Sequence, residues 1–208
     1  MVSVRSGFVF LAAVGLALAL GPAGSRAQGS ALPPVPDAIK SKVALCSACH
    51  GAAGVSGMAG VPNLAAEPDL FMQWQLVYFR GETRKNAQMN AVASLLSDDD
   101  IRDLSTYFLG LPPPSPSGVD SDPALTKAGG EIAADRHCSQ CHLPNFGGQS
   151  EIPRLAAQRE EVIVKALHDY QHGERRGRGN VIMPEIAYSL NEDDIKALAH
   201  FMSRQPGT

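Results

Sequence analysis

Apolar residues recur mainly at helical spacing along this sequence. Four helices are predicted from that spacing, over residues 37–48, 68–80, 122–136 and 159–171. Two more are expected after Ser97 and Asn191, polar residues that suit a helix N-terminus, because apolar side chains follow each at matching helical positions. Strand signals are almost absent. The pattern therefore predicts an all-α protein.

The first residues follow a different pattern. Arg5 precedes an apolar run over 8–20, and the small residues Ser25 and Ala27 follow it. This order is typical of a signal peptide, so we predict cleavage after Ala27 and export to the periplasm. An uncleaved membrane anchor is the alternative, but the run is shorter than the roughly 20 apolar residues that a span needs. We expect the mature chain to be soluble or at most peripherally membrane-associated.

All four cysteines of the chain lie in two copies of one motif. Residues 46–50 read CSACH and residues 138–142 read CSQCH. Two disulfides would account for the cysteines but not for the histidines. Structural zinc uses four ligands, usually from adjacent pairs, whereas these pairs are far apart in sequence; a thioredoxin-like site would need a βαβ context. The motif instead indicates c-type haem attachment, with Cys46 and Cys49 holding one haem c and Cys138 and Cys141 a second.

In this chemistry the histidine that ends each motif, His50 or His142, binds the haem iron. The sequence around the motifs is also duplicated. PNLA at 62–65 returns as PRLA at 153–156, and LSDDDI at 96–101 returns as LNEDDI at 190–195. A second iron ligand should recur in the same frame. Met89 and Met183 do so, each seven residues before the last repeated segment, in a stretch that we interpret as loop.

Other candidates for the sixth position lack a counterpart in the other half. Met58, in a glycine-rich loop near the first motif, is the main rival to Met89. Met58, Met72 and Met202 are otherwise expected to fill the core. Three histidines of the second half are expected at the surface: His168, His172 and His200. His137 is too close to Cys138 to reach the far side of the same haem.

Domain organisation follows from the repeat. We predict a signal peptide over 1–27, a first haem domain over 28–110, a Pro-rich linker over 111–121 and a second haem domain over 122–208. Of the 18 basic residues, 16 remain without Arg5 and Arg26, against 21 acidic residues, which gives a net charge of −5. This charge argues against nucleic acid as a partner.

These motifs resemble those of the cytochrome c4 family, two-haem class I cytochromes c, from about residue 37 to 204. The resemblance implies two tandem class I cytochrome c domains, each wrapped around one covalently attached haem. It also implies that the carbonyls of Pro62 and Pro153 accept hydrogen bonds from the two ligand histidines. The second half departs from the first at 173–180, GERRGRGN, which is longer and more basic.

His and Met ligands leave the iron closed to substrate, so we expect an electron carrier rather than an enzyme. The expected partners are redox proteins: a quinol-oxidising complex and a haem-copper oxidase, such as the cbb3 type. Alternatively the chain is a fixed cytochrome subunit of a sulfide- or alcohol-oxidising dehydrogenase. A dihaem peroxidase, which would need an open iron, is less favoured. Arg175, Arg176 and Arg178 are expected in a solvated loop; the alternative is pairing with haem propionates or an acidic partner.

Overall fold

The computed structural model describes residues 1–2, 32–116, 118–176 and 181–206. Most of the predicted signal peptide and Arg178 lie outside these residues. Within them the secondary structure is helical, with one isolated β-bridge between Gln149 and Ile152, so the all-α prediction is confirmed. None of the helices described is long and apolar enough to cross a membrane. The elements are η1 (Asp37–Ile39), α1 (Lys40–His50), α2 (Asp69–Arg80), α3 (Ala87–Ala93), α4 (Asp98–Leu109), α5 (Pro123–Asp135), α6 (Cys138–His142), α7 (Glu160–Gln171), α8 (Met183–Tyr188) and α9 (Glu192–Ser203).

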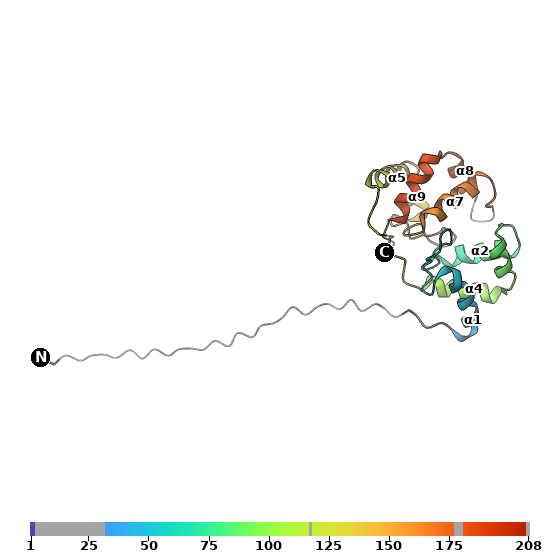
Figure 1. Cartoon of the computed structure of the whole chain (residues 1–208), viewed down its shortest axis with the longest axis horizontal. Helices are drawn as coiled ribbons and strands as arrows, with labels where there is room; N and C mark the ends of the chain where they lie inside the picture. The colour runs from blue at the N-terminus through green and yellow to red at the C-terminus, as the bar shows by residue number, and fades with distance from the viewer. Residues whose placement is uncertain (3–31, 117, 177–180, 207–208) are drawn as a thin grey trace. The chain divides into compact units, whose positions relative to one another are not determined.

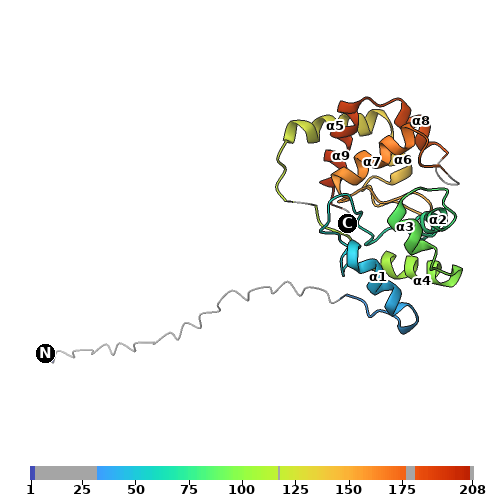
Figure 2. The same cartoon turned by 45° about the vertical axis from the view of Figure 1, so that its right-hand side comes forward.

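Two hydrophobic cores organise these helices, one in each half of the repeat. The first is built on α2 and α4, with Leu104 and Phe108 of α4 fully buried (Figure 1). The second is built on α7 and α9, with Ile195 of α9 buried, and α5 also packs on α9 (Figure 2). The apolar faces that predicted the helices are therefore the faces that form the cores.

The starts of α4 and α9 follow the predicted caps, and a polar residue caps α5 as well. Ser97 and Asn191 each form a capping box with the aspartate three residues on, Asp100 or Asp194. Asp122 accepts a hydrogen bond from the Leu125 N–H, and proline occupies the first turn of α5. These polar contacts satisfy N–H groups that the helix itself leaves without acceptors.

The methionine segments are helical, so the prediction of loops there was wrong. Met89 lies inside α3, where the Asn86 side chain caps the helix by accepting from the Met89 N–H at 2.9 Å. Met183 is the first residue of α8, and Pro184 follows it. Both helices are too short for apolar periodicity to show, at seven and six residues.

The two halves repeat one another at the level of single backbone hydrogen bonds. In the first, the Gly54 carbonyl accepts from the N–H groups of Leu64 and Ala65. In the second, the Phe146 carbonyl accepts from the N–H groups of Leu155 and Ala156. A few residues further on, Ala66 and Ala157 share the same left-handed conformation, with φ of 54° in both. The sequence repeat therefore encodes a repeated loop that follows each CxxCH motif.

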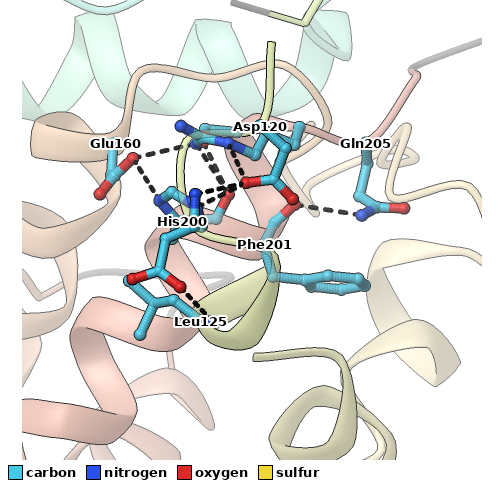
Figure 3. A network of polar contacts seen from close by, with 9 residues as sticks. Asp120, Leu125, Glu160, His200, Phe201 and Gln205 are labelled. Atoms are coloured by element: carbon cyan, nitrogen blue, oxygen red, sulfur yellow. Dashed lines mark hydrogen bonds and ion pairs between the residues drawn. The ribbon is translucent and has the colours of Figure 1, made fainter. Parts of the chain in front are cut away.

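The end of the linker is fixed to the second half by a buried histidine (Figure 3). His200 of α9 is 4% exposed; its Nδ1 lies 3.2 Å from Glu160 Oε2 and its Nε2 lies 3.1 Å from Asp120 Oδ1. Arg204 contacts both of these carboxylates. The expectation of a surface position for His200 was wrong, because the acidic partners that surround it come from two segments distant in sequence.

Candidate functional site

Both CxxCH motifs are helical, which places the two cysteines and the histidine of each within little more than one turn. Cys46, Cys49 and His50 end α1, while Cys138, Cys141 and His142 form α6. In each motif the first cysteine is partly buried against the core of its half and the second is exposed. A helix puts residues i, i+3 and i+4 on one face, so each motif presents two thiols and an imidazole together.

The histidines are buried and oriented by backbone carbonyls. His50 Nδ1 lies 2.8 Å from the Pro62 oxygen, and His142 Nδ1 lies 2.9 Å from the Pro153 oxygen. A carbonyl oxygen can only accept, so the imidazole proton is assigned to Nδ1 and the lone pair to Nε2. Burial lowers the pKa of both histidines against the opposing effect of these hydrogen bonds. The neutral ring with a free Nε2 lone pair is the form that binds a metal.

Met89 and Met183 pack against the same cores as the first cysteines of these motifs. The partly buried side chains that flank the first core include Cys46, Leu64 and Met89. Those that flank the second include the repeat equivalents Cys138, Leu155 and Met183. The same three positions therefore edge both cores, as expected of residues that would line a haem.

These residues fit two haem groups. No two of the four cysteines are joined as a disulfide in the structure, which gives no support to the disulfide alternative. Burial raises the pKa of Cys46 to about 11 and also raises that of Cys138. Among the described residues, no three His, Cys, Asp or Glu side chains gather as a metal site, so the four-ligand zinc alternative finds no ligand set there.

Comparison with known proteins agrees with this geometry. A family model described as Cytochrome c matches residues 126–205. Cytochrome c4 of Azotobacter vinelandii is 32% identical over 211 residues, covering 92% of this chain and 97% of its own. The chain belongs to the cytochrome c4 family. The reduced recombinant cytochrome c4 from Pseudomonas stutzeri has a similar structure, with a TM-score of 0.73 and 30% identity over 81% of this chain and 97% of its own.

As a member of this family the chain is a dihaem electron carrier with two class I cytochrome c folds and two covalently bound haem c groups. The CxxC pairs at 46/49 and 138/141 fit the two attachment sites. A further relative is the thiosulfate dehydrogenase electron acceptor of Thiomonas intermedia (strain K12), which is 31% identical over 180 residues, covering 79% of this chain and 80% of its own.

The other candidate ligands have different surroundings. Met72 and Met202 are buried core residues, as expected, but Met58 is 50% exposed and fills no core. His172, the residue that follows α7, is exposed, and His168 in the last turn of α7 has its Nε2 2.9 Å from Glu192 Oε2. Glycines on both sides of Met58 were the signal that it belonged to a surface loop.

Arg175 does not lie in a solvated loop, as was expected, but is 6% exposed. Its guanidinium lies over the rings of Phe71 and Tyr170, at 5.7 and 4.9 Å from their centroids, and donates to Gln75 Oε1 at 3.1 Å. Arg84 donates to the same oxygen at 2.7 Å, and burial lowers its pKa to about 9. Arg175 is buried because it contacts an aromatic ring and an amide on α2, a helix far away in sequence. Arg176, by contrast, is exposed.

Proposed function

We propose that this chain is a periplasmic electron carrier in which His50 and Met89 hold the first haem iron, and His142 and Met183 hold the second. The observation that carries the proposal is a repeated set: a histidine oriented by a carbonyl, and a methionine that packs against the same core as the first cysteine of the motif. Haem c supplies a one-electron Fe(II)/Fe(III) couple, which a thioether ligand biases toward Fe(II).

The chain's own residues have three tasks in this proposal. The cysteines fix each haem covalently, the Pro62 and Pro153 carbonyls hold the imidazoles in one orientation, and the methionines close the remaining coordination position. With an imidazole and a thioether bound to it, each iron would be closed to small molecules. These tasks suit transfer of electrons between proteins rather than catalysis, and they count against a peroxidase.

The proposed domain limits are those of the sequence repeat, 28–110 and 122–208, joined by residues 111–121, after removal of a signal peptide over 1–27. Gln28 would then be the first residue of the mature protein. N-terminal sequencing of the protein from a periplasmic fraction tests both statements. Recovery in the membrane fraction with residues 1–27 retained would contradict them.

The proposed partners are a quinol-oxidising complex as donor and a haem-copper oxidase as acceptor. A dehydrogenase is the second candidate donor, because one relative is named as the electron acceptor of thiosulfate dehydrogenase. Purification of the native protein distinguishes the two alternatives. A cytochrome that purifies alone supports a mobile electron carrier, and co-purification with a dehydrogenase supports a fixed subunit of that enzyme.

Substitution of the two methionines tests the ligand assignment. Met89→His or Met183→His should remove half of the sulfur-to-iron charge-transfer absorption of the oxidised protein. Either change should lower the potential of one haem, on the order of a tenth of a volt within the roughly 0.8 V range set by axial ligands. Met89→Ala or Met183→Ala should let carbon monoxide bind at one iron.

Three other methionines provide matched controls. Met72→His and Met202→His should destabilise the fold, since both side chains are buried, while the charge-transfer band stays. Met58→His should change neither, because Met58 is half exposed. Loss of the band in the Met58 variant would show that the first methionine ligand is assigned wrongly. Ready binding of carbon monoxide by the unaltered protein would favour the peroxidase.

A further inference from the structure

Each ligand histidine is connected to the other half of the molecule through a single peptide group. The carbonyl of the Pro62–Asn63 peptide accepts from His50, and the N–H of that peptide donates to Gln158 Oε1 at 2.9 Å. The carbonyl of the Pro153–Arg154 peptide accepts from His142, and its N–H donates to Glu67 Oε2 at 3.2 Å. The side chain behind each peptide therefore belongs to the opposite half.

These contacts are part of a reciprocal exchange between equivalent loops. Asn63 Nδ2 donates to the Ala157 carbonyl at 2.9 Å, and Arg154 Nε donates to the Ala66 carbonyl at 3.2 Å. Gln158 Nε2 also lies 3.4 Å from Glu67 Oε1. Protein hydrogen bonds thus run from one histidine to the other without interruption, through Gln158 and Glu67.

The two ends of this path differ in one chemical respect. Glu67 and Gln158 occupy equivalent places in the repeat, 91 residues apart, yet one is a carboxyl and the other an amide. Hydrogen bonds to an ionised acceptor are stronger than those to a neutral one, and bonds in a chain polarise each other. An ionised Glu67 therefore makes the Pro153 carbonyl a better acceptor, and a more strongly bound Nδ1–H makes the His142 imidazole a more electron-rich ligand.

We propose that Glu67 is a positioning residue for the second haem: its carboxylate acts through the Pro153–Arg154 peptide on His142 and lowers the reduction potential of that haem. The inference rests on His142 being the iron ligand, as in the proposed function. The first haem has the neutral Gln158 in the equivalent place. The structure thereby makes the two haems inequivalent even though their proposed ligands are the same.

Protonation of Glu67 should control this effect. The side chain is 5% exposed, and burial raises the pKa of Glu67 to about 8. Four weaker effects lower it: the Arg154 N–H bond, the charges of Arg154 and Arg175, and the Gln158 amide. An ionised carboxylate favours Fe(III), so the potential of the second haem should fall as the pH rises through this titration. It should level off once Glu67 is fully ionised.

The experiment uses the complete holoprotein and measures the potential of each haem from pH 5 to 10. Spectroelectrochemical titration gives the two potentials, and the paramagnetically shifted haem methyl resonances assign each to its haem. Glu67→Gln should abolish the fall with pH at the second haem and keep its potential at the low-pH value. At pH 10 and a fixed applied potential, we expect the Fe(III)/Fe(II) ratio of that haem to be about threefold lower in Glu67→Gln than in the wild type.

Gln158→Glu is the matched variant and also covers a failure of Glu67→Gln to fold. It should create a fall in potential with pH at the first haem. Because it also removes the Gln158 amide that lies 3.4 Å from Glu67 Oε1 and lowers the Glu67 pKa, it should move the fall at the second haem to higher pH. The proposal is overturned if Glu67→Gln leaves the pH profile of the second haem unchanged, or if both haems respond equally. Absence of the sulfur band from the unaltered protein would refute the methionine ligands instead, so the two failures are distinguishable.

Discussion

Replacing Asn63 with alanine should destabilise the protein strongly, although Asn63 is neither a core residue nor a proposed ligand. Its side chain is 6% exposed and satisfies two backbone groups: Oδ1 accepts from the Ser56 N–H and Nδ2 donates to the Ala157 carbonyl, both at 2.9 Å. Alanine would leave both groups buried without these partners. Each such group costs about 1–3 kcal/mol, so we expect the two together to lower the free energy of unfolding by about 2–6 kcal/mol.

Urea unfolding of the holoprotein, followed by circular dichroism and by haem absorption, measures this loss. Thr106→Ala on the exposed side of α4 is the control and should change the unfolding free energy by less than about 0.5 kcal/mol. Asn63→Asp keeps an acceptor for Ser56 but places an oxygen opposite the Ala157 carbonyl, so it should also be less stable than wild type. An Asn63→Ala protein as stable as the control would refute the reasoning that the exchanged hydrogen bonds hold the loops together.

Two further substitutions test close packing and the buried cation. Gly129→Ala should cost about 3 kcal/mol, measured by thermal unfolding, because its Cβ would lie 2.1 Å from the Ala197 carbonyl oxygen of α9; Gly57→Ala, with open space around it, should be nearly neutral. Arg175→Met should cost about 2 kcal/mol through loss of its ring contacts and its bond to Gln75, and should lower a haem potential by removing a buried positive charge. Arg176→Met is the control, because Arg176 is exposed. Equal effects of the two changes on stability and potential would contradict the conclusion that Arg175 is the buried cation.

Much of the fold could be predicted because its signals are local. Ser97, Asp122 and Asn191 cap helices whose apolar residues recur at the expected spacing, and CxxCH is a contiguous motif with one dominant chemical use. The short helices that carry the methionines gave no periodic signal, although Asn86 and Pro184 are typical of helix starts.

Long-range contacts account for the errors. Arg175 was expected at the surface because charged side chains are usually exposed, and His200 because it has no counterpart in the first half. Each is buried by partners about 80 to 100 positions away, such as Asp120 for His200 and Gln75 for Arg175. No periodicity within one segment can indicate such a contact. For Glu67 the signal lies in the repeat itself, because the equivalent residue of the second half, Gln158, is an amide and not an acid.

The reciprocal contacts also constrain how the two halves can diverge. The bonds donated by the backbone N–H groups of Asn63 and Arg154 are equivalents of one another, and so are the bonds donated by their side chains, so a substitution in one half alters only one member of a pair. At Asn63 and Arg154 the backbone N–H makes the equivalent bond whatever the side chain is, and both side chains still donate to an alanine carbonyl. At Glu67 and Gln158 the exchanged acceptor itself has changed from amide to carboxyl. A duplicated protein can thus keep the geometry of its junction and differ in charge behind one histidine only. On our proposal this difference separates the potentials of two haems that have the same ligands, without moving either ligand set.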